Sequence, residues 1–258
     1  MQITPPYGFS EVVPLTKTHR VRLPQGRRVP PVFRSMTLLP VSCSEFPLAS
    51  RDYPLAFISG DQGKTYASMA VLGFEARQNL FVQPDGAWDS AVYLPAYVRR
   101  YPFCMTRITV NGEVRPERVT CVEKQALDER GAALFDRQGN PVPEWQALEK
   151  LLFEYEADML RTEEMCRLLA QHQLLEPFVM QALPNQGQPL QMTGLFRVAE
   201  AKLAALDAGS LKELAQKNLL ACLYAHLFSL GNFERLLGRR AALAPSPAAA
   251  TPKTKTLN

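Results

Sequence analysis

The sequence predicts an α+β protein with a β-rich N-terminal half built of hairpins and a largely helical C-terminal half, sharing one core. In the N-terminal half, short runs of apolar and β-branched residues are separated by turn residues, as in antiparallel sheets. From Trp145 onward, apolar residues instead recur at spacings of three and four, as on one face of a helix. The chain has 258 residues, of which 47% are hydrophobic and 21% charged, so it is long and apolar enough to bury a core.

The predicted strands of the N-terminal half begin with a hairpin around the loop 60–64, whose two glycines favour a turn. A second hairpin is indicated by Asn111-Gly112, the strongest short-range hairpin signal, which follows a β-branched run. We expect strands at residues 53–59, 65–72, 79–82, 103–110 and 119–122.

The helical half begins with an amphipathic helix, because the apolar residues from Trp145 to Met159 fall on one face. Alternating apolar residues then predict a further hairpin from residues 174–183 and 190–198. The sequence Ser-Leu-Lys-Glu at 210–213 is a capping box, which opens a helix running towards Gly231. Short helical segments are expected at 200–206 and 233–237.

Composition divides the chain into three parts. Residues 1–34 carry six basic residues against one acidic residue and hold six prolines, which predicts an extended basic arm laid over the body. Residues 35–240 form the α+β domain. Residues 241–258 are rich in Pro, Ala, Thr and Lys, which predicts a disordered tail.

Charge, cysteine content and hydropathy indicate a soluble cytoplasmic protein. The net charge of +4 and the pI of about 8.8 are too mildly basic for a dedicated nucleic-acid binder, so we expect no nucleic-acid partner. The five scattered cysteines form no disulfide framework, and the N-terminus shows no apolar signal sequence. The uncharged runs 177–196 and 218–233 are too polar or too short to be transmembrane segments.

The motifs for metal, nucleotide and nucleophilic chemistry are missing. The three histidines are dispersed without a second ligand at metal spacing, so we expect no metal and no cofactor. The stretch 59–65 imitates a phosphate-binding loop, but Ile58 replaces the required first glycine and a strand follows, so a hairpin turn is favoured. No nucleophile motif appears, no catalytic residue is assigned, and whether the protein is an enzyme stays open, with a binding role favoured.

The stretch 93–103 concentrates four aromatic rings and two guanidinium groups, which could clamp a carboxylate or phosphate against an aromatic wall. Consecutive helical residues point about 100° apart, so one arginine should face the body and pair with a carboxylate while the other faces a ligand. In the alternative interpretation, the tyrosines pack the core and the arginines pair with Glu75, Asp89 or Asp136 to fix the fold. The candidate ligand-binding residues are Tyr93, Tyr97, Arg99, Arg100 and Tyr101, with Glu75, Asp89, Asp136 and His226 as supporting candidates.

His226 needs separate weighing, because it lies within an apolar helical stretch. It could serve as a catalytic base or a ligand. A core histidine that is held by a hydrogen bond is the favoured interpretation.

Several stretches together resemble the SapC family of bacterial proteins over residues 7–237. The resemblance begins with Tyr7-Gly8, Val13-Pro14-Leu15 and His19, and the sequence departs from it at Ala199, where an acidic residue is expected beside Glu200. The other matching stretches are EFPLASRDYPLAF (45–57), LGFEARQNLFV (72–82), DGAW (85–88), YLPAYVRRYPF (93–103), ALFDRQGNP (133–141), GLFRVAEAKLAAL (194–206) and YAHLFSL (224–230).

The SapC family takes its name from an association with bacterial surface-layer protein loci, and the accessory role that the resemblance implies comes from the genes that lie near its relatives. Relatives are often encoded near TonB-dependent receptors, flavin-dependent tryptophan halogenases and cupin-like oxygenases. We therefore expect a soluble accessory or binding protein that recognises a peptide, a modified amino acid or a protein partner of an envelope or uptake system. The alternatives are a metal-independent enzyme that uses the arginines and tyrosines of the stretch 93–103, and a structural surface-layer component. The missing export signal argues against the surface-layer alternative.

Overall fold

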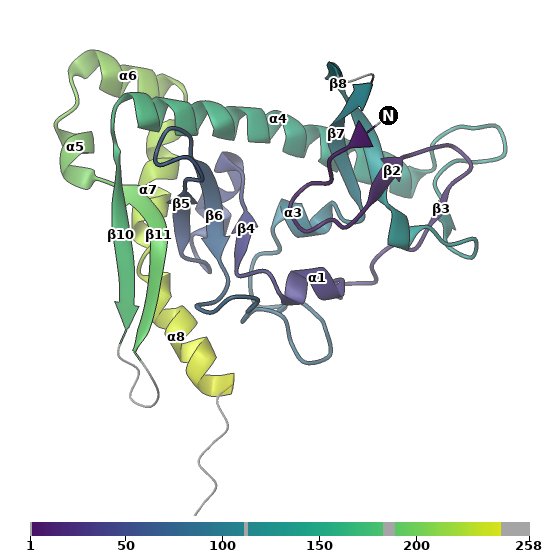
Figure 1. Cartoon of the computed structure of the whole chain (residues 1–258), viewed down its shortest axis with the longest axis horizontal. Coiled ribbons are helices and arrows are strands. Elements are labelled where there is room, and N and C mark those ends of the chain that lie inside the picture. The colour runs from purple at the N-terminus through teal and green to yellow at the C-terminus, as the bar shows by residue number, and fades with distance from the viewer. Residues whose placement is uncertain (1, 111–112, 183–188, 244–258) are drawn as a thin grey trace, which may run out of the picture.

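Two larger antiparallel sheets joined by one long helix, together with a small two-stranded sheet, form the framework of the computed structural model (Figure 1), which describes residues 2–110, 113–182 and 189–243. The joining helix, α4 (Pro143–Gln171), packs against strand β7 of the first sheet and strand β6 of the second. The remaining long helices follow in the C-terminal part of the chain. The α+β class and the concentration of helices in the C-terminal part are thus confirmed.

The first sheet has the strand order β1-β7-β8-β2. Its centre is the predicted hairpin of β7 (Phe103–Val110) and β8 (Glu113–Glu123), in which β8 begins earlier than the expected residue 119. The predicted turn at 111–112 lies outside the described residues. The flanking strands are β1 (Gln2–Ile3) and β2 (Val12–Pro14), and β3 (Arg20–Val21) pairs separately with β9 (Ala132–Ala133).

The second sheet has the order β10-β11-β5-β6-β4, so a hairpin from late in the chain completes a sheet begun early. Both predicted hairpins are present, and β11 pairs with β5. In the loop before β6, the Asp61 carboxylate accepts the backbone N–H groups of Lys64 and Thr65, which confirms the turn. The strands are β4 (Leu38–Pro40), β5 (Leu55–Ile58), β6 (Ala67–Val71), β10 (Leu175–Ala182) and β11 (Leu190–Val198).

The strand expected at 79–82 is not formed. The buried Asn79 side chain accepts the backbone N–H of Phe81 at 2.9 Å and donates to the Phe33 carbonyl at 2.7 Å. An asparagine that bonds nearby backbone in this way competes with a strand ladder. Only Val82 makes an isolated bridge in this stretch, to Trp88.

The helix expected from Ser210 to Gly231 is two helices, α6 (Ala208–Gln216) and α7 (Leu219–Ser229). They are separated at Asn218, whose φ of 56° is left-handed and interrupts the helix. The N-cap of α6 is Asp207, whose carboxylate accepts the backbone N–H groups of residues 209 and 210, so the predicted cap at Ser210 is wrong.

The remaining helices are short, apart from the last. Residues 241–243 of the predicted tail belong to this last helix, and 244–258 lie outside the described residues. The elements are α1 (Pro31–Arg34), α2 (Phe46–Ala49), α3 (Ala96–Arg99), α5 (Glu200–Ala204) and α8 (Asn232–Leu243), with 3₁₀ turns η1 (Cys43–Glu45) and η2 (Lys124–Ala126).

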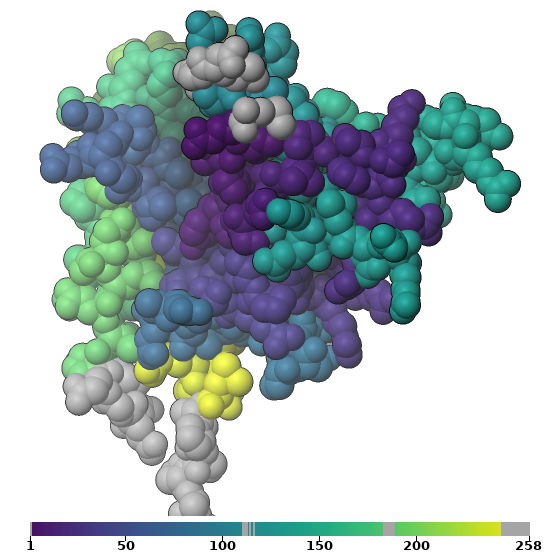
Figure 2. Space-filling view, turned by 45° about the vertical axis from the view of Figure 1, so that its right-hand side comes forward, coloured from purple at the N-terminus to yellow at the C-terminus, as the bar shows by residue number. Residues whose placement is uncertain are grey.

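The N-terminal segment 2–34 runs largely extended across one face, where it is purple in Figure 2. It is tied to the body by its short strands and by side chains in the core, among them Val12, Val21 and Phe33. The N-terminal segment is therefore an integral part of the folded structure.

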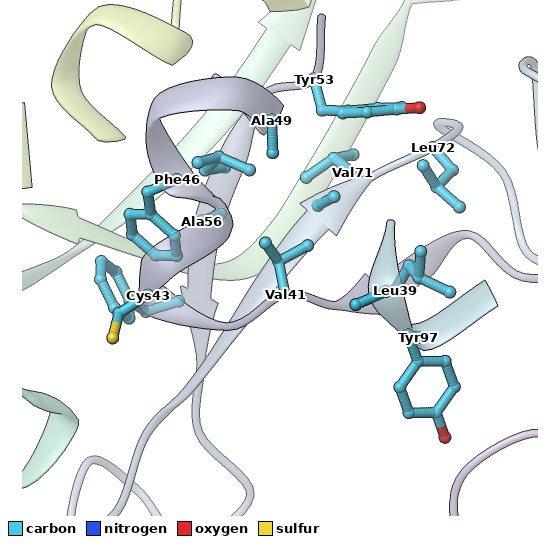
Figure 3. Packing of buried hydrophobic residues seen from close by; sticks show 14 of the residues in the cluster. Leu39, Val41, Cys43, Phe46, Ala49, Tyr53, Ala56, Val71, Leu72 and Tyr97 are labelled. Atoms are coloured by element: carbon cyan, nitrogen blue, oxygen red, sulfur yellow. The ribbon is translucent and has the colours of Figure 1, made fainter. Parts of the chain in front are cut away.

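The buried apolar residues form two clusters instead of the one shared core that we expected. The larger cluster lies around the second sheet, where Figure 3 shows Leu39, Val41 and Val71 packed together. The smaller cluster lies against the first sheet and includes Trp145. Helix α4 contributes to both clusters, since it is long enough to cross both sheets. All five cysteines are buried free thiols.

Candidate functional site

The stretch 93–103 folds into the four-residue helix α3, which Pro95 precedes and Tyr101-Pro102 follows. A residue before proline is disfavoured in the helical region, so the helix ends there. The two consecutive arginines diverge, as their angular separation predicts. Arg99 is exposed, whereas Arg100 is only 2% exposed.

Arg100 is enclosed by aromatic rings. Its guanidinium carbon lies 4.2 Å from the ring centre of Tyr97, 4.8 Å from that of Tyr155 and 5.3 Å from that of Phe9. Cation–π attraction to three rings stabilises the buried charge. The rings come from three separate parts of the chain: α3, α4 and the N-terminal segment.

The polar contacts of Arg100 are few for a buried charge. Its Nη1 lies 4.0 Å from the Glu156 carboxylate, and its buried Nε has no hydrogen-bond partner within the described residues. Glu156 is in closer contact with Arg118 of β8. Guanidinium groups have five donors, so Arg100 retains capacity to bind a further acceptor.

A third guanidinium belongs to the same region. Arg107 of β7 lies directly opposite Arg118 in the β7–β8 ladder. Like charges directly across two strands repel each other. The Glu156 carboxylate is in contact with both Arg118 and Arg100. Arg107 lines the same cavity as these three residues.

This cavity, here called the Arg100 cavity, has a volume of about 470 Å³. Three arginines and two glutamates line it, so positive charge is in excess. Volumes of a few hundred Å³ are typical of small-ligand sites. The cavity lining includes Tyr7, Tyr97, Arg100, Arg107, Arg118 and Tyr155, together with Glu156 and Glu163 and apolar residues such as Met105 and Met159.

Both tyrosines that flank Arg100 are neutral at physiological pH. Burial raises the pKa of Tyr97, although the nearby Arg100 charge opposes this effect. Burial likewise raises the pKa of Tyr155. The Tyr97 hydroxyl donates to the Tyr7 carbonyl, and in Figure 3 it points away from Leu39 at the edge of the larger cluster. Tyr97 and Tyr155 therefore line the cavity as neutral rings whose hydroxyl groups keep their protons.

Tyr93 and Arg99 face a different part of the structure. The Tyr93 hydroxyl donates to the buried Glu45 carboxylate at 2.9 Å, and burial raises its pKa to about 12, with the Glu45 charge adding to this effect. Arg99 donates to the Tyr93 hydroxyl and to the Leu94 carbonyl, both at 3.1 Å. Glu45 also accepts the Ala96 backbone N–H, so this group fixes the start of α3.

The five predicted ligand-binding residues thus divide into groups. Tyr97 and Arg100 line the Arg100 cavity, Tyr93 and Arg99 form the network at Glu45, and Tyr101 lines two other hollows beside the N-terminal segment. The prediction gave the ligand to the outward-facing arginine, but it is the inward-facing Arg100 that lines this cavity.

The supporting candidates lie elsewhere and do not meet Arg100. Glu75 pairs with Arg240 at 2.7 Å, and Asp89 pairs with Arg239 at 2.8 Å. Asp136 binds the backbone N–H groups of its own turn, 136–140. The alternative interpretation, in which the two arginines pair with Glu75, Asp89 or Asp136, is therefore wrong in its partners, since Glu156 is the carboxylate near Arg100 and Arg99 donates to Tyr93 and Leu94.

His226 is a core histidine. Its Nε2 accepts the Val198 backbone N–H at 3.1 Å, and its Nδ1 therefore carries the proton and donates to the Leu55 carbonyl at 3.0 Å. Burial lowers the pKa of the imidazole to about 4, although the Leu55 carbonyl opposes this effect. The ring thus joins α7 to β11 and β5 in its neutral form.

Sequence reasoning missed Arg118, Tyr155, Glu156 and Arg107. One signal could have found Glu156, which follows Leu152 by four positions and therefore lies beside the apolar face of α4. A carboxylate at such a position requires a cation as partner. The partner arginines lie far away in the sequence, on α3 and β8, and no local pattern marks them.

Among the described residues, no cluster of three or more His, Cys, Asp or Glu side chains is placed to hold a metal ion. None of the helices within the described ranges is long and apolar enough to cross a membrane.

Among known proteins, the chain matches one family and no curated protein or solved structure. The model of that family covers residues 17–236, a stretch that includes α3, both strands of the β7–β8 hairpin and α4. The chain therefore belongs to the SapC family.

Proposed function

We propose that this protein is a non-catalytic binding protein that captures the anionic group of a modified amino acid or of a peptide end in the Arg100 cavity. The observation that carries the proposal is the state of Arg100. It is buried against three rings, its Nε lacks a partner in the described part of the chain, and its nearest carboxylate oxygen is 4.0 Å away. A ligand carboxylate would supply the missing acceptors through a charge-assisted, bidentate contact.

Neighbouring charges support an anion as the ligand. Arg107 and Arg118 face each other across two strands, and among the described residues Glu156 is the one carboxylate in close contact with Arg118. An added negative group would reduce the repulsion among the three guanidinium groups. A neutral ligand would leave that repulsion unchanged.

Apolar and aromatic groups in the same cavity support a ligand with an apolar body. Tyr97 and Tyr155 provide ring faces, and Met105 and Met159 provide adaptable apolar contacts. An amino acid or a peptide end combines such a body with a carboxylate. The volume of about 470 Å³ suits one residue of this kind better than a folded domain.

Binding is favoured over catalysis by the protonation of the two tyrosines. A general base works best with a pKa near the operating pH, and burial moves the pKa values of Tyr97 and Tyr155 away from it. The candidates for catalytic support, His226, Asp89 and Asp136, have their own partners elsewhere. We propose an envelope or uptake system as the source or the destination of the ligand.

The proposal is tested by identifying what the protein carries from its native cell. Wild type, Arg100→Met and the exposed control Arg99→Gln are purified in parallel, denatured, and analysed by mass spectrometry for released small molecules and peptides. We expect a compound with a free carboxylate or phosphate on wild type and on the control, depleted at least about tenfold on Arg100→Met. Equal loading of all three proteins, or ligands without an anionic group, would contradict the proposal.

A further inference from the structure

Two adjoining hollows lie where the N-terminal segment crosses the body, apart from the Arg100 cavity. Their volumes are about 500 and 220 Å³. We call them together the arm groove; the residues that line both hollows are Leu23, Pro24, Arg28, Val29, Pro30 and Tyr101. In Figure 2 the N-terminal segment is purple on the face shown, with teal parts of the chain lying between its stretches.

The charged residues that line the arm groove are all arginines. Arg22 and Arg28 line the larger hollow, and Arg27, Arg28 and Arg99 line the smaller one. Arg22 reaches Asp128 at 2.8 Å, but no carboxylate belongs to the lining of either hollow among the described residues. A groove with positive charge alone is complementary to an acidic partner.

The base of the arm groove is apolar. Val29 and Val98 are buried beneath it, and Leu94 and Leu148 are half-buried at the smaller hollow. Tyr101 lines both hollows and is fixed by packing, with its ring centre 5.6 Å from that of Phe33. The groove therefore offers two apolar recesses with arginines around them.

The wall of the arm groove is held in place before any partner binds. Arg27 Nη2 donates to the carbonyl groups of Asp89 at 2.9 Å and Val92 at 2.6 Å. The Val29 backbone N–H donates to the Gly86 carbonyl at 3.0 Å. A preformed groove lowers the conformational entropy lost on binding.

We propose that the arm groove binds an extended segment of a partner protein in which acidic and apolar residues alternate. Successive side chains of an extended chain point to opposite sides, so apolar side chains can enter the recesses while acidic ones meet the arginines. The proposed interaction involves neither Arg100 nor its cavity, and it would bring a protein partner to a second site with a separate set of lining residues.

The test uses defined probes and fluorescence anisotropy. The first is a fluorescein-labelled heptapeptide of alternating glutamate and leucine, the second has serine for every leucine, and the third is a labelled thymidine oligonucleotide of similar length. We expect saturable binding of the first peptide, with affinity at least about tenfold above that of the other two probes. Equal binding of all three probes would show a general polyanion surface, and no binding of the first peptide would also overturn the proposal.

The site is assigned by two double variants at exposed positions. Arg28→Gln with Arg99→Gln removes charge from the arm groove, whereas Arg130→Gln with Arg137→Gln removes the same charge elsewhere. We expect the first double variant to weaken binding of the glutamate–leucine peptide about tenfold or more, and the second to change it less than about twofold. Equal weakening by both would overturn the assignment to the arm groove.

Discussion

Arg100 carries a buried positive charge that lacks the close carboxylate and the full set of hydrogen bonds that usually stabilise such a charge. Three rings surround its guanidinium, but the Glu156 carboxylate is 4.0 Å away and Nε is without a partner in the described residues. Burial of a charge costs free energy unless hydrogen bonds and counter-charges replace water. A protein that needed only stability at this position would gain more from an apolar side chain of similar volume.

Two substitutions of Arg100 should therefore differ in their effect on the free energy of unfolding. Arg100→Met keeps most of the volume and removes the poorly paired charge, so the free energy of unfolding should stay within about 1 kcal/mol of wild type or rise. Arg100→Ala also leaves a void between Tyr97 and Tyr155 and should cost about 3 kcal/mol. Denaturant unfolding measures both values. If Met destabilises as strongly as Ala, Arg100 is a structural ion-pair residue.

His226 should make stability fall in mild acid. Its pKa is lowered to about 4 by burial, whereas an unfolded histidine titrates near pH 6.5, so the unfolded state binds more protons between these values. Stability is therefore complete above about pH 6.5 and declines as the pH falls towards 4, by about 2 kcal/mol at pH 5.

The measurement compares the free energy of unfolding at pH 7 and pH 5 in wild type, His226→Gln and a control, His19→Gln, on a half-buried loop residue. The difference between the two pH values should shrink by about 2 kcal/mol only in His226→Gln. An unchanged pH dependence in that variant would show that other groups cause the acid sensitivity.

At the scale of elements, the break between α6 and α7 depends on one left-handed residue. Asn218 is exposed and has a φ of 56°. Glycine adopts this conformation without strain, whereas alanine does not. Asn218→Ala should therefore be less stable than Asn218→Gly by about 1 kcal/mol in denaturant unfolding. In one continuous helix the order would be reversed, because alanine is the better helix former.

Elements with local signals were predictable from the sequence, and those fixed by distant contacts were not. Strand β7 and helix α4 follow from β-branched runs and from apolar periodicity within one segment. The helix break at Asn218 and the irregular stretch at Asn79 depend on side-chain and backbone contacts that have no strong sequence signature. The candidate site was found in part for the same reason: 93–103 is a dense local cluster, whereas Glu156 and Arg118 approach it only in the fold.

For the whole molecule, α4 links two apolar clusters that would otherwise be separate. Trp145 belongs to the smaller cluster and Trp88 to the larger one, and both are 1% exposed. A shared helix should make the two clusters unfold together, because loss of α4 would expose the apolar surface of both. The Arg100 cavity lies where α4 passes the β7–β8 hairpin, so its shape depends on this joint.

The two tryptophans allow this cooperativity to be measured. Trp88→Phe leaves Trp145 to report the smaller cluster, and Trp145→Phe leaves Trp88 to report the larger. In each variant we expect the fluorescence midpoint in denaturant to coincide with the midpoint from far-ultraviolet circular dichroism. Loss of Trp145 fluorescence at a clearly lower denaturant concentration than the loss of helix would show that the smaller cluster unfolds independently.

Selectivity of the Arg100 cavity for a carboxylate can be measured by calorimetric titration with a matched pair of probes. N-acetyl-phenylalanine carries a free carboxylate on an apolar body, and its amide differs only in lacking that charge. We expect wild type and Arg99→Gln to bind the acid at least about tenfold more tightly than the amide, and Arg100→Met to lose this preference. Equal affinity of wild type for the two compounds, or no saturable heat with the acid, would show that Arg100 does not make the cavity selective for a carboxylate.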